Sequence, residues 1–215
     1  MAKVKVKICG ITNWTDAKRA VDAGADFLGF NFYAPSPRYI PPAKARQIAR
    51  RLPKRVTKVG VFVNESEPTI LAIAHCVGLD RVQLHGDESP LMISHLRGKL
   101  GVIKALRAGK AFRPAEVSRY KNSSAILLDG FDRKLRGGTG KTLDWSLARR
   151  ANRYARIFLA GGLTPENVAD AIRTAQPYAV DVCSGVESKP GKKDPKKIQR
   201  LMAAIESAQK HGSRP

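Results

Sequence analysis

The chain has 215 residues, of which 43% are hydrophobic, so it can bury a globular core, and it has no apolar run long enough to span a membrane. Lysine and arginine total 39 against 18 aspartate and glutamate residues, which gives a formal net charge of +21. The basic residues are scattered and accompany no recognition motif, which argues against nucleic acid as the primary partner. A highly charged surface, or steering of an anionic substrate, explains the charge as well. The charged N-terminus lacks the apolar run of a signal peptide, so we expect a cytoplasmic protein.

The three cysteines, Cys9, Cys76 and Cys183, lie far apart in the chain. Their odd number and wide spacing argue against a disulfide framework, and without a Cys-x-x-Cys pair structural zinc is not indicated. The histidines share no helical or strand face, so we predict no metal site. Cys76 lies in an apolar helical stretch and is interpreted as a core residue.

One unit repeats along the chain: an apolar strand, a short loop and an amphipathic helix. The strands are short and apolar on both faces, as buried parallel strands are. In chain order we predict strands at Val4–Cys9, Phe27–Phe32, Thr57–Val63, Arg81–Leu84, Val102–Leu106, Ala125–Asp129, Ile157–Ala160 and Ala179–Cys183. Helices are expected near Trp14–Ala23, Pro42–Arg51, Pro68–Cys76, Ser89–Leu96, Pro114–Tyr120, Trp145–Asn152, Pro165–Thr174 and Pro195–Gln209.

Local signals support several of these helix ends. Thr164-Pro165-Glu166 reads as a capping residue, a proline in the first turn and an acid, and Asp194-Pro195 repeats the first two features. Gly24 follows the first helix, where a terminating glycine belongs.

Eight strand–helix units predict an α/β fold, a (β/α)8 TIM barrel forming a single domain over residues 1–215, with 210–215 as a disordered tail. The alternative is an open, doubly wound sheet. That fold usually has five or six strands and a glycine fingerprint in its first turn, where this chain has Cys9-Gly10-Ile11-Thr12. The barrel is therefore favoured.

Chemistry in such a barrel lies at the carboxyl ends of the strands. Gly161 and Gly162 follow the seventh strand, and Ser184 and Gly185 follow the eighth. Glycines there let backbone N–H groups approach a phosphate, and a helix N-terminus adds a favourable dipole. Turn glycines are common, but two such turns at this strand pair predict a phosphate site and a phosphorylated small-molecule substrate.

Cys9 ends the first strand and shares a strand face with Lys7, which could stabilise a thiolate. The alternative for Cys9 is a small core residue.

Asp129 ends the sixth strand after four apolar residues, where a carboxylate rarely serves packing; the alternatives for it are a helix cap or a salt bridge. Asp181 competes with Asp129, although a buried ion pair with a barrel lysine would also explain it. His85 could line the pocket.

The segment Gly137–Thr142 invites comparison with a phosphate-binding loop, but that pattern needs glycine where Leu135 stands. The segment belongs to a long polar loop, Gly130–Thr142, which we expect to act as a mobile lid.

A series of motifs, in order along the chain, resembles the phosphoribosylanthranilate isomerase family. The motifs are Lys7-Ile8-Cys9-Gly10-Ile11-Thr12, Gly60-Val61-Phe62-Val63-Asn64, Gln83-Leu84-His85-Gly86, the Gly137–Thr142 loop with Asp144-Trp145, Leu159-Ala160-Gly161-Gly162-Leu163, Val180-Asp181-Val182-Cys183-Ser184-Gly185-Val186-Glu187 and Pro190-Gly191-Lys192-Lys193-Asp194.

The resemblance implies a cofactor-free Amadori rearrangement in tryptophan biosynthesis, on a (β/α)8 barrel, from N-(5-phosphoribosyl)anthranilate to a carboxyphenylamino-deoxyribulose phosphate. The family's cysteine base and aspartate acid match Cys9 and Asp129. Its arginine that meets the substrate carboxylate matches Arg38, for which a solvated loop arginine is the alternative. Cys183 stands where the family more usually has serine. The resemblance predicts no oligomeric state.

Two other functions compete with this one. The sugar isomerase of histidine biosynthesis is also a phosphate-binding barrel, but it relies on two aspartates, and Cys9 stands where one of them would be. The non-enzyme alternative is a basic barrel that binds nucleic acid.

Overall fold

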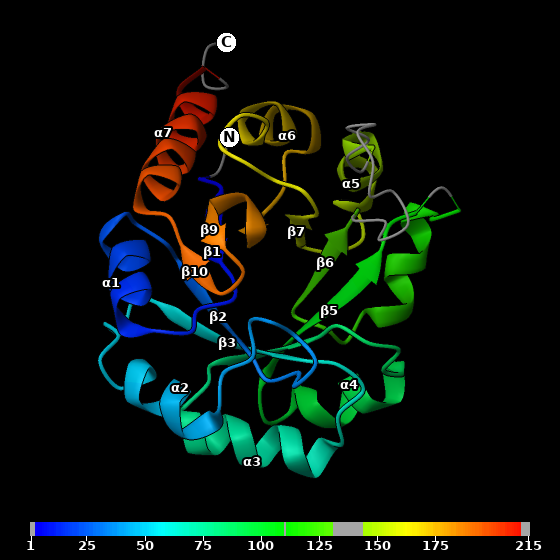
Figure 1. Ribbon diagram of the computed structural model, residues 1–215. Helices are drawn as coiled ribbons and strands as arrows, with labels where there is room; N and C mark the ends of the chain where they lie inside the picture. Colours follow the sequence, from blue (N-terminus) through cyan, green and yellow to red (C-terminus); the bar gives the residue numbers. More distant parts are fainter. Residues whose placement is uncertain (1–2, 110, 131–143, 212–215) are drawn as a thin grey trace.

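The computed structural model describes residues 3–109, 111–130 and 144–211, which form a closed barrel of eight parallel strands surrounded by helices (Figure 1). The strands pair in chain order, and β1 closes the barrel against β8. Their bounds are β1 Lys5–Ile8, β2 Phe27–Asn31, β3 Thr57–Phe62, β4 Arg81–Leu84, β5 Gly101–Arg107, β6 Ala125–Asp129, β7 Ile157–Ala160 and β8 Ala179–Val182. The predicted (β/α)8 fold is confirmed.

A helical segment follows each strand and covers the outside of the barrel. The segments are α1 Trp14–Asp22, α2 Pro42–Ala49, α3 Glu67–Val77, α4 Pro90–Arg97, a 3₁₀ helix at Pro114–Tyr120, α5 Trp145–Ala151, α6 Val168–Ala175 and α7 Pro195–His211. A 3₁₀ turn at Ser184–Val186 and a small hairpin, β9 Glu187–Lys189 and β10 Lys192–Lys193, lie between β8 and α7. None of the described helices is long and apolar enough to cross a membrane.

Apolar side chains fill two separate spaces. The larger cluster packs between the outward faces of the strands and the helices. The smaller cluster lies inside the barrel, where Phe27 and Phe158 meet edge to face with ring centroids 5.2 Å apart. Because side chains alternate along each strand, every second residue points into the barrel. This series of inward-pointing residues fills the barrel and continues to its mouth, at the carboxyl ends of the strands.

The local helix signals have mixed outcomes. Asp194 caps α7 as predicted, since its Oδ1 accepts the Lys196 N–H at 2.8 Å, and Gly24 follows α1 with a φ of +100°. The predicted start at Pro165 is wrong, because α6 begins only at Val168. There the Thr164 hydroxyl accepts the Glu166 N–H, at 3.2 Å, in a turn that precedes the helix.

Two further expectations need correction. Cys76 is exposed on the outer surface of α3 and is not a core residue, because the buried side of that helix is formed by Ile70, Ala74 and Val77. Residues 210 and 211 belong to α7 and not to the expected tail, whose remaining residues, 212–215, lie outside the described ones.

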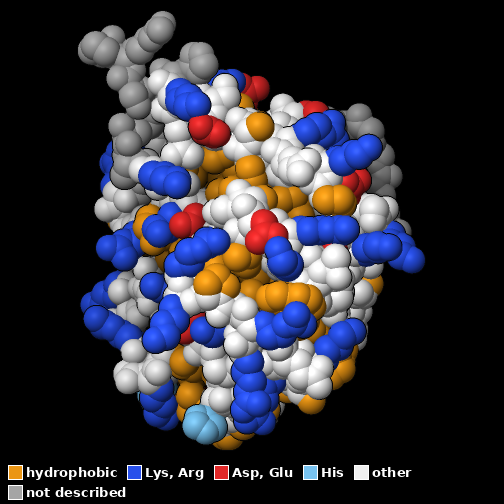
Figure 2. Space-filling view, turned by 90° about the vertical axis from the view of Figure 1, so that its left-hand side faces the viewer, with side chains coloured by type: hydrophobic (Ala, Val, Ile, Leu, Met, Phe, Trp, Pro, Cys, Tyr) orange, Lys and Arg blue, Asp and Glu red, His pale blue; other side chains and the backbone are white. Residues whose placement is uncertain are grey.

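Basic side chains are distributed over the surface. On the face shown in Figure 2, lysine and arginine side chains extend from one end of the molecule to the other, with few acidic side chains between them. The positive charge therefore does not gather into one patch on that face.

Candidate active site

The predicted catalytic residues lie at the carboxyl ends of their strands, at the mouth of the barrel. On β6 the inward series passes from Leu127, which packs inside the barrel, to Asp129. On β8 it passes from Ala179, also inside the barrel, to Asp181 and then to Cys183 just beyond the strand. These side chains therefore point toward the barrel axis at the end where barrel enzymes carry out chemistry.

Cys9 lies just beyond β1, one layer above Lys7. Its N–H donates to the Val182 carbonyl oxygen at 3.0 Å, so the ladder between β1 and β8 continues past the strand ends. A Cβ built on Gly29 would lie 2.7 Å from Cys9 Sγ and 3.2 Å from Lys7 Nζ, so both groups sit over the same glycine. The structure thus brings the Lys7 ammonium next to the Cys9 thiol.

The surroundings of Cys9 favour the thiolate. A hydrogen bond with the Cys183 thiol lowers the pKa of the Cys9 thiol well below its usual range; burial opposes this shift, and the Lys7 and Lys193 ammonium groups reinforce it. The same hydrogen bond raises the pKa of the Cys183 thiol well above its usual range, and burial reinforces the shift. The Cys183 thiol also lies 3.9 Å from Glu187 Oε1, to which it can donate. Of the two thiols, the surroundings therefore favour ionisation of Cys9, and the thiolate is the form that a base requires.

Lys7 and Asp181 form an ion pair inside the barrel. Lys7 Nζ donates to both carboxylate oxygens at 2.9 Å, and the two residues are 0% and 8% exposed. Burial raises the pKa of Asp181 to about 6, although Lys7 opposes the shift. Burial also disfavours the charge on Lys7, but the Asp181 carboxylate outweighs it and raises the Lys7 pKa. Asp181 is thus held in the buried ion pair that was the alternative interpretation of this residue.

Asp129 lies at the mouth beside His85. Its side chain is 24% exposed, and its Oδ2 is 3.5 Å from His85 Nε2. The Gln83 amide nitrogen lies 2.8 Å from His85 Nδ1. In this orientation the amide donates, so His85 Nδ1 accepts and the ring proton is on Nε2, facing Asp129. His85 therefore lies at the mouth of the barrel, next to one of the two candidate catalytic groups.

Arg38 is partly buried and forms an ion pair with Glu187. Its Nε and Nη2 donate to the Glu187 carboxylate at 2.9 and 2.7 Å, and Lys193 Nζ donates to the same carboxylate at 3.0 Å. Burial opposes ionisation of Glu187, but the hydrogen bonds from Arg38 and Lys193 outweigh it and lower the Glu187 pKa. A Cβ on Gly10 would lie 2.9 Å from Arg38 Cδ, which places this arginine beside the residue that follows Cys9.

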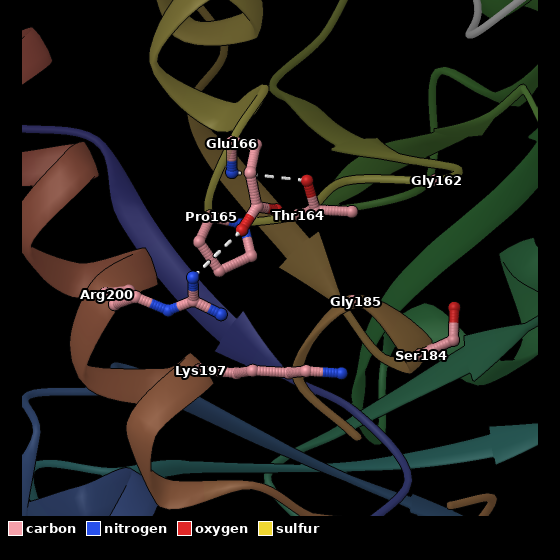
Figure 3. A pocket seen from close by; sticks show the side chains of 8 residues that line it. All are labelled: Gly162, Thr164, Pro165, Glu166, Ser184, Gly185, Lys197 and Arg200. Atoms are coloured by element: carbon pink, nitrogen blue, oxygen red, sulfur yellow. Dashed lines mark hydrogen bonds and ion pairs between the residues drawn. The ribbon is translucent and has the colours of Figure 1, made fainter. Parts of the chain in front are cut away.

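A pocket of about 440 Å³ lies beyond β7 and β8. Figure 3 shows Lys197 and Arg200 extending from α7 toward the loops that follow these strands. Lys197 Nζ donates to the Glu187 carbonyl oxygen at 2.8 Å, and Arg200 lies 3.4 Å from the Glu166 carboxylate. The pocket is lined by Gly162, Thr164, Pro165, Glu166, Ser184, Gly185, Lys197 and Arg200.

The backbone in this pocket requires glycine at two positions. Gly162 has a φ of +65°, and a Cβ at Gly185 would collide with the Leu163 carbonyl oxygen. Gly161, with a φ of +88°, does not line this pocket and lies against Asp129 and Gly130. Among the described residues, the N–H groups of Gly162, Ser184 and Gly185 find no hydrogen-bond acceptor. These N–H groups, with two nearby cations, can bind a phosphate.

Sequence reasoning missed several residues of this site. Glu187 and Lys193 belonged to recognised motifs but had no role assigned, and the pairing of Glu187 with Arg38 joins residues 149 positions apart. Lys197 and Arg200 are three residues apart on α7, a spacing that places both on one helix face and could have indicated their approach to the same pocket.

Two other expectations concern absences or unplaced residues. The expected lid, Gly130–Thr142, lies outside the described residues except for its first residue. The part of the chain that the structure describes contains no group of three His, Cys, Asp or Glu side chains that could hold a metal ion.

Comparison with known proteins identifies the family. The family model described as N-(5'phosphoribosyl)anthranilate (PRA) isomerase matches residues 6–204. The chain belongs to this family. The predicted resemblance and the predicted enzyme class, an isomerase, are confirmed.

Relatives and solved structures agree with this assignment. The N-(5'-phosphoribosyl)anthranilate isomerase of Rubrobacter xylanophilus is 48% identical, over 94% of this chain and 99% of the relative. The phosphoribosyl anthranilate isomerase structure from Thermotoga maritima is 45% identical with a TM-score of 0.85, covering 95% of this chain and 99% of that one. Another structure, 43% identical with a TM-score of 0.81 and covering 95% of this chain and 99% of that one, holds reduced 1-(o-carboxyphenylamino)-1-deoxyribulose 5-phosphate.

The thiol pair predicts a shifted pH dependence of Cys9 alkylation. In a Cys76→Ser background, we expect iodoacetamide to modify Cys9 at lower pH than it modifies N-acetylcysteine, because the thiolate is the reactive form. Replacing Cys183 by alanine removes the first cause of the lowered pKa, so the midpoint should move to higher pH. Peptide mapping identifies the modified cysteine, and identical midpoints with and without Cys183 would contradict the prediction.

Proposed function

We propose that this barrel converts N-(5-phosphoribosyl)anthranilate to 1-(2-carboxyphenylamino)-1-deoxy-D-ribulose 5-phosphate, a step of tryptophan biosynthesis, with Cys9 as base and Asp129 as acid. The observation that carries the proposal is the placement of a thiolate-favouring cysteine and a carboxyl group on the inner face of one barrel mouth, next to a cationic pocket. The reaction needs no cofactor, since a proton donor and a proton acceptor are sufficient.

The rearrangement requires two groups in opposite protonation states. Opening of the furanose ring needs an acid at the ring oxygen, while the aniline nitrogen supplies electrons to form a Schiff base. A base then removes the proton from C2 of the sugar. The lowered pKa of Cys9 supports the thiolate as that base, and the position of Asp129 at the open end of β6 supports it as the acid.

Asp181 is the competing acid, and its contacts argue against it. Both of its oxygens accept from Lys7 Nζ at 2.9 Å, and it lies below Cys183 in the barrel. Burial raises its pKa to about 6, which still leaves most of the group ionised at neutral pH. An acid must present its proton to substrate, and the exposed fraction of 24% makes the Asp129 side chain the more accessible of the two.

The substrate's two anionic ends have candidate partners. The pocket beyond β7 and β8 supports phosphate binding through the N–H groups of Gly162, Ser184 and Gly185 and the neighbouring Lys197. Arg38 supports binding of the anthranilate carboxylate, because Glu187 occupies Nε and Nη2 and leaves Nη1 without a hydrogen-bond partner among the described residues. The two hydrogen bonds to Glu187 fix the plane of the Arg38 guanidinium.

The direct test is loss of the substrate's anthranilate-type fluorescence with the purified protein. Turnover at catalytic enzyme concentration supports the proposal, and its absence in a folded sample contradicts it. The histidine-pathway analogue is assayed beside it, because turnover of that compound alone would favour the competing isomerase.

The catalytic assignment predicts which variants fail. We expect Cys9→Ala and Asp129→Asn each to lose at least about 10³-fold in kcat with modest changes in KM, as loss of a general acid or base does. Cys76→Ala and Asp22→Asn are the matched controls, since both residues lie on outer helix surfaces. Substantial kcat in Asp129→Asn, together with collapse in Asp181→Asn, would transfer the acid role to Asp181.

The phosphate pocket predicts a binding defect in Gly162→Val. A side chain there blocks close approach to the N–H groups, and the φ of +65° makes the substitution strained, so KM should rise strongly. Gly98→Val is the control, because a Cβ at Gly98 meets nothing within 4 Å. An unchanged KM in a Gly162→Val protein that melts cooperatively would remove the phosphate from this position.

The carboxylate partner predicts weaker binding in Arg38→Ala. Loss of one charged hydrogen bond costs about 1.5–3 kcal/mol, which corresponds to roughly a 10- to 150-fold increase in KM. Arg46→Ala, at an exposed position of α2, is the control. Equal KM values for Arg38→Ala and the parent protein would refute this role.

A further inference from the structure

Two cysteines follow the strands that meet at the seam where the barrel closes, Cys9 after β1 and Cys183 after β8. In the ladder between β1 and β8, Lys7 pairs with Asp181 and Ile8 pairs with Val182. Continued by one residue, this register would pair Cys9 with Cys183, which directly follow the two strands. The Lys7–Asp181 contact at 2.9 Å, one layer below, shows that side chains on this inward face meet across the seam.

The spacing of neighbouring strands such as β1 and β8 suits a disulfide bond between them. Neighbouring strands lie about 4.8 Å apart, and the Cα atoms of native disulfides are usually about 4.4–6.8 Å apart. The N–H of Cys9 donates to the Val182 carbonyl oxygen at 3.0 Å, so the two segments of the backbone are still hydrogen-bonded just beyond the strands. A Cβ on Gly10 would lie 3.0 Å from Cys183 Sγ, which places that sulfur against the backbone next to Cys9.

The pair also has the asymmetry that thiol oxidation requires. The pKa of the Cys9 thiol is lowered and that of Cys183 is raised, so one member is the nucleophile and the other holds a proton. Lys193 Nζ lies 3.8 Å from Cys183 Sγ, where it can stabilise the second thiolate when that proton leaves.

We propose that Cys9 and Cys183 are a reversible oxidation site, which a hydroperoxide converts to a disulfide and a thiol reductant restores. The Cys9 thiolate attacks one peroxide oxygen, the O–O bond breaks, and hydroxide leaves, so Cys9 becomes a sulfenic acid. Cys183 loses its proton and attacks the Cys9 sulfur, and the sulfenic oxygen leaves as water. In total, two thiols and one hydrogen peroxide give one disulfide and two waters.

This oxidation removes the nucleophilic electron pair of Cys9 from the mouth of the barrel. Loss of isomerase activity on oxidation therefore rests on the proposed role of Cys9 as base. Formation of the disulfide does not rest on that role, so the two can be measured separately.

The experiment exposes the Cys76→Ser protein to hydrogen peroxide. We expect an intact mass lower by two hydrogens, one cross-linked peptide containing Cys9 and Cys183, and loss of isomerase activity, all reversed by dithiothreitol. The Cys183→Ala protein in the same background lacks the second thiol. It should form no cross-link, and its activity, relative to its own untreated sample, should be lost without recovery as Cys9 proceeds to the sulfinic acid. Cys183→Ser serves as a second variant if the alanine protein does not fold.

Three results separate the possibilities. Oxidation of Cys9 to the sulfinic acid in the presence of Cys183, without a cross-link, would overturn the proposal. Full recovery of the Cys183→Ala protein by dithiothreitol, equal to that of its parent, would also overturn it, because protection would then not need the pair. A cross-link with undiminished activity would support the oxidation site and contradict the assignment of Cys9 as base.

Discussion

A buried ion pair across the β1–β8 seam is the interaction on which the candidate site depends. Removing one partner of such a pair typically costs about 3–5 kcal/mol, because the other charge is left uncompensated. Lys7 and Asp181 also fix the register of the seam, and a slip by one residue would turn Cys9 away from the barrel axis. The same lysine lowers the pKa of Cys9. One contact therefore serves closure of the barrel, orientation of the thiol and its ionisation.

A second buried carboxylate connects the loops above the seam. Glu187 receives hydrogen bonds from Arg38, which follows β2, from Lys193 in β10, and from the Gly191 N–H at 3.3 Å. Because the carboxylate is only 6% exposed, these donors are held in one arrangement before any ligand arrives. Preorganisation of this kind reduces the entropy lost on binding, which is why a paired arginine can still serve as an anchor.

The sequence predicts the features of the fold that depend on interactions between residues close together in the chain. All eight strands follow from short apolar runs, and Asp194 caps α7 through contacts with its own next residues. The predicted start of α6 was wrong because Thr164 and Pro165 fit a turn as well as a helix. In the structure the Asn167 amide donates to the Gly162 carbonyl oxygen, a contact that belongs to the turn. The prediction that Cys76 is a core residue was wrong because an apolar helical sequence does not show which side of the helix faces the barrel. The contact of Arg38 with Glu187 spans 149 residues and has no local signature.

The cations of this chain act in two different ways, which the net charge of +21 does not distinguish. Lys7, Lys104 and Lys193 are buried and hydrogen-bonded to carboxylates, so their effect is confined to the groups they touch. The lysine and arginine side chains on the face in Figure 2 are spread over the surface, where salt screens each of them within about 8–10 Å. Such a distribution raises the rate at which an anion reaches the protein without choosing where it binds. The selection of a site is therefore local: it rests on the few cations and N–H groups at the mouth, whose partners fix their positions.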